Sequence, residues 1–240
     1  TLYRTLWGQT GSVTAVTFGP TGDWLASGDS EGGLRRWKLA DGRMTAKLDG
    51  RGAEATAVAV SPDGERVARA DRRGITLWWP ASGVSRNTGV EGPTRDVVFH
   101  PDRTAIFAVG ETAVELVDME TGEVRRAFRI EPRWGPIRRV ALHPAGDRLV
   151  GGCENGSVVV WDLATGTRRQ RLRRRVTTPL AGLNQILDEM QDDEDFESIA
   201  AAMVGDDVIN VGVTPDGERD VSVGSKRITV WDFADGQVDG

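Results

Sequence analysis

The side chains best suited to acid–base or nucleophilic chemistry are two histidines, His100 and His143, and one cysteine, Cys153. Such catalysis needs a base within hydrogen-bonding reach of the group that it activates. Both histidines directly precede a proline in a turn-forming stretch, where similar stretches of this chain carry Gly, Ser or Thr. Cys153 follows two glycines in a stretch with strand-like alternation, where a buried, inert thiol is the ordinary case. These positions predict structural roles, and we expect a protein that is not an enzyme.

Patterns typical of cofactor or metal sites are equally sparse. The acidic run at Asp192, Asp193, Glu194 and Asp195 lacks the glycine that a calcium-binding loop needs for its sharp turn. The sequence has no Gly-Lys-Ser/Thr phosphate loop and no dinucleotide-binding fingerprint. A single cysteine allows neither an internal disulfide nor a cysteine-based zinc site, and it fits a reducing compartment. The sequence therefore predicts no cofactor, no metal and a cytoplasmic location.

Overall charge and hydropathy argue against further classes. The 240 residues carry a formal net charge of −6, whereas proteins that bind duplex nucleic acid are usually basic. No apolar run approaches the ~20 residues that span a bilayer, and the first residues lack a signal-peptide pattern. We therefore expect a protein or peptide partner, with no nucleic acid and no membrane. The chain begins at Thr1 rather than Met, which indicates processing, trimming or origin in a larger multidomain chain or complex.

Two turn markers recur along the chain and define the elements that must position these side chains. The first is a proline-led turn after an apolar stretch, and its prolines are Pro20, Pro62, Pro101, Pro144 and Pro215. The second places a glycine five residues after an apolar position, which is Trp37, Trp78, Val117, Trp161 or Trp231. Proline presets φ in a turn and glycine accepts positive φ, so each marker predicts a hairpin turn. The stretches between them alternate with period two, which predicts short antiparallel strands and an all-β fold.

The motifs Phe/Val-x-Pro-Asp-Gly and Val-x-x-Trp-Asp-x-x-x-Gly resemble the WD repeat of WD40-type β-propellers over nearly the whole chain. The likeness is closest at Trp161-Asp162 and Trp231-Asp232 and weaker at Val117-Asp118, whereas Trp37-Lys38 and Trp78-Trp79 lack the aspartate. The family's Gly-His pair before the first strand is replaced by Gly8-Gln9, Gly50-Arg51 and Gly92-Pro93. We therefore expect the family's buried His–Asp hydrogen-bond network to be absent and apolar packing to take a larger share.

The resemblance implies five divergent repeats, each a blade of four antiparallel strands packed radially round a channel. It also implies a non-catalytic scaffold for protein–protein interaction. The Arg-rich and Gly-rich repeats with little Lys resemble bacterial sequences of high GC content, in which such domains often form the sensor part of kinases or signalling ATPases. Two alternatives stay open, namely an enzyme whose active site is carried by propeller loops and a structural domain that oligomerises.

We expect residues 1–240 to form a single propeller domain. Residues 2–6 resemble an outermost strand with no blade before it, and the fifth repeat stops at Gly240 before its own outermost strand. The N-terminal strand is therefore expected to complete the last blade, which leaves no free sheet edge. The alternative is a repeat array cut at this phase, with further blades of a larger ring outside this sequence.

An insertion at about residues 174–207 separates the fourth and fifth repeats. Leu183, Ile186, Leu187 and Met190 recur at spacings of three and four, which predicts a short amphipathic helix. Acidic residues that include Asp192 and Asp193 follow, and an arginine-rich stretch precedes. One interpretation is a partner-specific arm containing these six residues. The alternative is a solvated loop whose acidic run folds back on the arginines.

Function on a propeller depends on its loops rather than on the fold. By repeat phase, the face of the insertion, here called the top face, also carries the loops that lead into the innermost strands and the turns between second and third strands. The candidate protein-binding residues there are Arg72, Arg73, Arg95, Trp134, Arg138, Glu154, Asn155, Asn210 and Lys226. Their mixed charge favours a protein or peptide, although exposed charge is ordinary in loops. Trp134 is either an exposed anchor of the binding site or packed over the blade edge.

Overall fold

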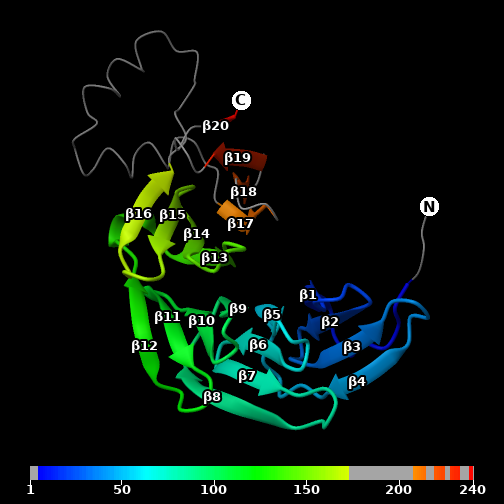
Figure 1. Ribbon diagram of the computed structural model, residues 1–240. Helices are drawn as coiled ribbons and strands as arrows, with labels where there is room; N and C mark the ends of the chain where they lie inside the picture. Colours follow the sequence, from blue (N-terminus) through cyan, green and yellow to red (C-terminus); the bar gives the residue numbers. More distant parts are fainter. Residues whose placement is uncertain (1–4, 173–207, 215–218, 225–227, 233–237, 240) are drawn as a thin grey trace, which may run out of the picture. The chain divides into compact units, whose positions relative to one another are not determined.

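The computed structural model describes residues 5–172, 208–214, 219–224, 228–232 and 238–239. These residues form strands, turns and a short 3-10 helix, η1 (Pro132–Trp134), so the prediction of an all-β fold is confirmed (Figure 1). The chain divides into two compact units, Thr1–Ala127 and Phe128–Gly240. The predicted insertion at about residues 174–207, with its helix and acidic stretch, lies outside the described residues.

The first unit contains three four-stranded antiparallel sheets, whose strands pair in chain order. The first sheet consists of β1 (Val13–Phe18), β2 (Trp24–Asp29), β3 (Leu34–Lys38) and β4 (Met44–Leu48). The second consists of β5 (Ala57–Val60), β6 (Val67–Asp71), β7 (Gly74–Trp78) and β8 (Ser85–Glu91). The third consists of β9 (Asp96–Phe99), β10 (Ala105–Val109), β11 (Ala113–Asp118) and β12 (Val124–Arg129). The boundary between the units falls inside β12.

The second unit contains two more sheets of the same plan. One consists of β13 (Ile137–Leu142), β14 (Arg148–Cys153), β15 (Val158–Asp162) and β16 (Arg168–Leu172). The other consists of β17 (Val208–Val213), β18 (Arg219–Gly224), β19 (Ile228–Asp232) and β20 (Val238–Asp239).

The fifth sheet corrects one prediction about its outer edge. β20 pairs with β19 through Trp231↔Val238 and Val230↔Asp239, so the fifth repeat does not stop before its own outermost strand. The sequence after Trp231 carries the second turn marker, which in the other four sheets lies between the third and fourth strands. Of the N-terminal strand expected at this edge, residues 1–4 lie outside the described residues, and residues 5 and 6 form no strand.

In the first four sheets the proline-led turns join the first two strands, and local polar contacts hold them. In the second sheet the Ser61 hydroxyl accepts a hydrogen bond from the Arg66 amide at 2.9 Å. Gly64 adopts a φ of +73°, a left-handed conformation that costs glycine little because it has no Cβ. Arg103 holds the equivalent position in the third sheet with a φ of 63°, where a Cβ introduces strain.

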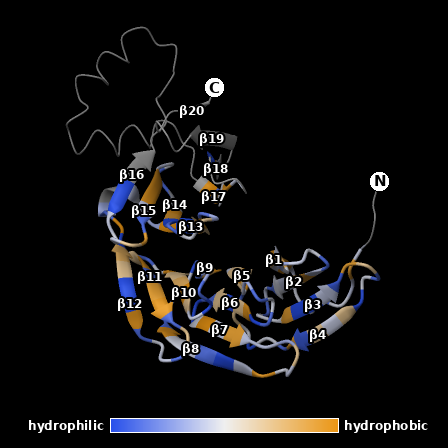
Figure 2. Cartoon of the chain, in the orientation of Figure 1, coloured by the Kyte–Doolittle hydropathy of each residue, from blue (hydrophilic) through white to orange (hydrophobic). Residues whose placement is uncertain are grey.

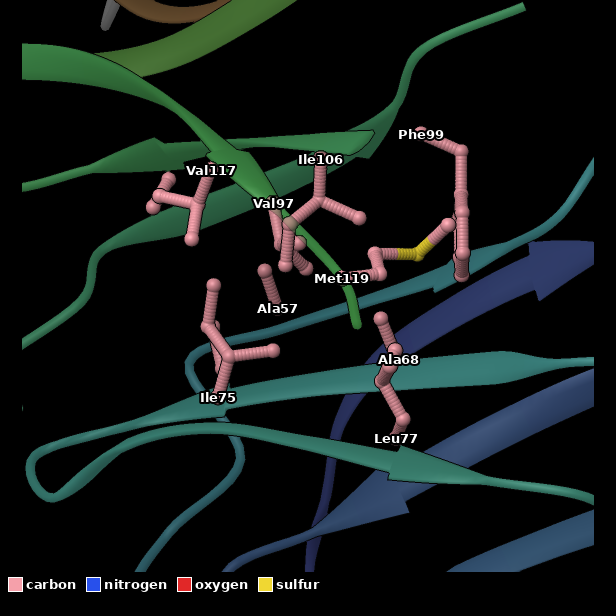
Figure 3. Close-up of a cluster of buried hydrophobic side chains, with 11 residues drawn as sticks. Ala57, Ala68, Ile75, Leu77, Val97, Phe99, Ile106, Val117 and Met119 are labelled. Carbon is pink, nitrogen blue, oxygen red and sulfur yellow. The ribbon is translucent and has the colours of Figure 1, made fainter. Parts of the chain in front are cut away.

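The apolar core lies between neighbouring sheets of each unit. Trp37, Trp78 and Trp161 at the second turn marker are 1%, 0% and 3% exposed, which confirms their predicted place in the core. Between the second and third sheets of the first unit, Ile75 and Leu77 pack with residues of β9, β10 and β11 (Figure 3). Figure 2 shows β10 and β11 as predominantly hydrophobic and the outermost strand β8 as predominantly hydrophilic. The loops at the strand ends are therefore displayed on rigid, packed supports.

Candidate functional site

The turn between β2 and β3 is held by a buried carboxylate, Asp29, which is 0% exposed. Its Oδ1 accepts hydrogen bonds from the amides of Gly33 (2.7 Å) and Glu31 (3.1 Å), and its Oδ2 accepts one from the Thr10 hydroxyl (2.9 Å). Burial by itself raises the pKa of Asp29, but these hydrogen bonds together outweigh burial and hold the pKa below its ordinary value. Asp29 is thus the acid that fixes this turn.

A second polar group in the same sheet surrounds Trp37. Its Nε1 donates a hydrogen bond to the Ser27 hydroxyl at 2.7 Å, and Gln9 Nε2 also donates to Ser27. Gln9 stands where the resemblance expects the histidine of the Gly-His pair and bonds to Ser27, and the next residue, Thr10, bonds to Asp29. Two polar side chains other than histidine therefore bond within this sheet, so polar contacts persist there beside the apolar packing.

The turn between β6 and β7 is held by a buried ion pair that the sequence analysis missed. Arg69 Nη2 and Asp71 Oδ2 lie 2.9 Å apart, and the two side chains are 5% and 3% exposed. Arg69 Nη1 donates to the carbonyl of Gly32 in the preceding sheet, and Asp71 Oδ1 accepts the Arg73 amide at 2.7 Å. A signal was available, because residues two apart in a strand share a face and alanines flank Arg69 on both sides.

Three of the predicted top-face residues lie on neighbouring loops of the first unit. Arg72 and Arg73 are exposed at the tip of the β6–β7 turn. Arg95 is half-buried in the loop that leads into β9. The amide of Thr94 donates to the Asp71 carbonyl at 3.0 Å, which fixes this loop against the turn. The structure therefore brings Arg72, Arg73 and Arg95 to one part of the surface.

In the second unit, four predicted residues lie at or near the turn between β14 and β15. Arg138 Nη2 lies 3.3 Å from Glu154 Oε1, and Asn155 Oδ1 accepts a hydrogen bond from a backbone amide two residues on, at 3.0 Å. Trp134 is 1% exposed, and the guanidinium carbon of Arg168 lies 5.0 Å from its ring centroid. Two roles were open for Trp134, an exposed anchor or a ring packed over the blade edge. The structure supports the packed ring, because Trp134 is buried.

The remaining predicted residues are not brought into either group. Asn210 in β17 is exposed, and its Oδ1 accepts a hydrogen bond from the Val211 amide at 2.9 Å. Lys226 and the arm residues Leu183, Ile186, Leu187, Met190, Asp192 and Asp193 lie outside the described residues. Their proposed roles stay predictions.

The two histidines and the cysteine, which are the residues best suited to catalysis, lie in turns and in the buried core. His100 and His143 lie in proline-led turns, where their Nδ1 atoms are 3.0 Å from Asp102 Oδ1 and 2.8 Å from Asp147 Oδ1. Cys153 is buried, as predicted. In the part of the chain that the structure describes, no group of three or more His, Cys, Asp or Glu residues is placed to hold a metal ion. No helix among these residues is long and apolar enough to cross a membrane.

The sheets share one plan that defines the class of protein. Each has four antiparallel strands in chain order, and in the first unit the loop that leads into a sheet bonds to the turn of the sheet before. The Ala55 amide donates to the Asp29 carbonyl at 3.1 Å, just as the Thr94 amide donates to Asp71. Repeated four-stranded antiparallel blades of this plan are those of a β-propeller.

The family model described as WD domain, G-beta repeat matches residues 1–38 and 130–162. Over these two segments the match agrees with the resemblance seen in the turn markers.

Curated relatives with WD repeats are similar over about two thirds of the chain. Periodic tryptophan protein 2 homolog of Dictyostelium discoideum is 27% identical over 64% of this chain and 18% of its own length. Target of rapamycin complex subunit LST8 of Mus musculus is 25% identical over 66% of this chain and 50% of its own length. WD repeat and HMG-box DNA-binding protein 1 of Xenopus laevis is 26% identical over 72% of this chain and 13% of its own length. The chain thus spans half or less of these proteins.

Proposed function

We propose that the chain is a non-catalytic scaffold or sensor domain that binds a protein or peptide through its top face. The observation that carries the proposal is the β6–β7 turn, where Arg72 and Arg73 are exposed while the buried Asp71 fixes the backbone beneath them. A recognition surface on a rigid turn loses less conformational entropy on binding than a flexible loop does. Arg95 on the adjoining loop extends the same surface.

The relatives support an assembly role. One of them is by name a subunit of the target of rapamycin complex, so a chain with similar repeats takes part in a multiprotein assembly. The carboxylates that hold the turns support the non-catalytic part of the proposal. Asp29 and Asp71 are buried and bonded to backbone amides, which leaves them poorly placed to exchange protons with a substrate.

The test is affinity capture followed by reconstitution with the purified partner. A charge-reversal variant, with Arg72, Arg95 and Arg138 each changed to Glu, is expected to lose at least tenfold in affinity for that partner. Its matched control changes Arg43, Arg103 and Arg169, which are exposed and lie in or beside the other turns, to Glu and is expected to bind normally. Equal affinity of the charge-reversal variant and the original chain overturns the top-face assignment. Deletion of residues 176–206 tests the arm separately, since unchanged affinity excludes a binding role for it.

Two further parts of the proposal concern organisation and location. We infer that the five repeats form a single domain, because the boundary between the two compact units falls inside one strand, β12. A single cooperative unfolding transition supports this inference, and two separate transitions contradict it. We also place the protein in the cytoplasm, since its single cysteine, Cys153, is buried and suits a reducing compartment. Fractionation of the host cell checks this location.

A further inference from the structure

Two adjoining cavities open beside the second sheet of the first unit. The larger has a volume of about 430 Å³, and its lining includes Arg51, Arg69, Arg73, Thr76 and Asn87. The smaller, of about 90 Å³, shares all of these residues except Arg73 and adds Arg86 and one acid, Asp49. Asp49 and Arg51 come from the loop between β4 and β5, and the others come from β6, β7, β8 and the β6–β7 turn. The cavities thus bring together arginines from separate parts of the sequence.

Arg69 is a buried side chain whose position at this site is fixed by its contacts. It is 4% exposed, its Nη2 lies 2.9 Å from Asp71 Oδ2, and that same atom donates to the Thr76 hydroxyl at 3.2 Å. Its Nε is buried with no hydrogen-bond partner among the described residues. Burial lowers the pKa of Arg69, and the charges of Arg51 and Arg73 lower it further, against the opposing effect of Asp71. The guanidinium groups of Arg51 and Arg73 therefore each repel that of Arg69.

The positive charges of the other two arginines, Arg51 and Arg73, are not neutralised by an ion pair among the described residues. The side chains of Arg51 and Arg73 are exposed and form no ion pair in the part of the chain that the structure describes. The acids that line the larger cavity are Asp71, which is engaged with Arg69, and Glu91. Three arginines thus face two acids, in a chain whose net charge is −6. Local positive charge of this kind attracts an anion.

Neutral donors are available beside the arginines. The Thr76 hydroxyl donates to Asn87 Oδ1 at 3.2 Å, which fixes the orientation of this amide. The Asn87 Nδ2 amino group is then left to donate to a ligand. Arginine forks and amide groups together match the geometry of carboxylate and phosphate oxygens.

We propose that this cavity binds an anionic side chain of the partner, either a carboxylate or a phosphate carried on a peptide. This inference rests on the proposed function, because Arg73 belongs to the top-face turn, and it names the chemical class of the partner. Arg51 and Arg73 form charge-assisted hydrogen bonds to the anion at the rim. Arg69 supplies the positive charge at the base, and Asn87 donates from the side.

The experiment measures fluorescence anisotropy of labelled decapeptides with the full chain at low ionic strength. One peptide alternates glutamate with glycine, a second carries phosphoserine in place of glutamate, and a third carries glutamine. The first two are expected to bind, and the one with higher affinity identifies the anion as carboxylate or phosphate. Free inorganic phosphate is expected to compete with the peptide that binds. The double change Arg51→Gln and Arg73→Gln is expected to weaken binding at least tenfold.

The double change Arg43→Gln and Arg103→Gln is the matched control, because both are exposed arginines of the first unit that line neither cavity. It is expected to bind the peptides within twofold of the original chain. The inference is overturned if the glutamine peptide binds as well as the anionic ones, if neither anionic peptide binds, or if the control change at Arg43 and Arg103 weakens binding as much as the change at Arg51 and Arg73. If the double variant binds anionic peptides normally while the charge-reversal variant still loses its partner, the anion site is wrong and the top-face proposal stands.

Discussion

The ion pair between Arg69 and Asp71 gives the sharpest stability prediction, made with Asp71→Asn. The substitution keeps the oxygen that accepts the Arg73 amide but places an amino group against the Arg69 guanidinium, 2.9 Å away in the native pair. Both side chains are at least nine-tenths buried, so the variant leaves a buried cation without its partner. Breaking a buried pair in this way costs about 3–5 kcal/mol. The adjoining cavity gives water some access to Arg69, so we expect the lower end, about 3 kcal/mol.

For a domain of this size, about 3 kcal/mol corresponds to a fall in Tm of about 6–12 °C. Urea and thermal denaturation of the original chain and of Asp71→Asn, Arg69→Met and the double variant form a double-mutant cycle. We expect a coupling free energy of about 2 kcal/mol, because the double variant removes both charges at once. Asp63→Asn is the control, since its partner Arg66 lies 3.2 Å away in a less buried pair, and it is expected to cost about 1 kcal/mol or less. A coupling energy below about 0.5 kcal/mol refutes the view that the pair holds the turn.

Three further predictions concern single residues. Arg103→Gly relieves a φ of 63°, so we expect chemical denaturation to show a gain of about 0.5–1 kcal/mol, and a loss contradicts the strain. Gly151→Ala places a Cβ 2.8 Å from the Trp161 ring, so we expect a loss of about 1–3 kcal/mol with a lower Tm, and an unchanged Tm shows that the ring can move. The pKa of Asp118 is lowered to about 2, chiefly by the Thr121 amide and then by Arg125, from an ordinary 3.8. Because the folded-state pKa is the lower one, its contribution to stability is complete above about pH 4 and disappears as the pH falls toward 2. Asp118→Asn is therefore expected to flatten the acid limb of a stability-against-pH curve, and an identical limb is evidence against this assignment.

The fold could be predicted from the sequence because its signals are local. A proline-led turn and a glycine five residues after Trp37, Trp78 or Trp161 each depend on a few neighbouring residues, and their phase places these indoles in the core. The pairing of β20 with β19 was missed, although the turn marker after Trp231 carried the information. Because the sequence stops at Gly240, the expectation was that the fifth repeat ends before its own outermost strand.

The candidate site was predicted less well because burial of polar residues depends on distant parts of the chain. A positive charge inside β6 is ordinary for a solvent-facing position, but Arg69 is buried and donates a hydrogen bond to the Gly32 carbonyl of the preceding sheet. Trp134 is covered by Arg168 from β16, far along the sequence. Repeat phase placed Arg72 and Arg73 correctly in a turn between second and third strands, since turn position is a local property. It could not show which arginines share a cavity.

Comparison of the first two sheets indicates that the arginine cavity of the second sheet lowers the stability of the fold. Ser27 and Arg69 occupy the same place, two residues after the strand residue paired with Trp37 or Trp78. In the first sheet the Ser27 hydroxyl accepts the Trp37 Nε1 hydrogen bond, whereas Trp78 Nε1 is buried with no hydrogen-bond partner among the described residues. A buried donor left without a partner costs about 1–3 kcal/mol, and a buried ion pair rarely improves on apolar packing. A serine at this position would satisfy Trp78 but would remove the cation at the base of the cavity. Local departures from stable packing concentrate at functional sites, so the second sheet, rather than the better-bonded first, is where recognition is expected.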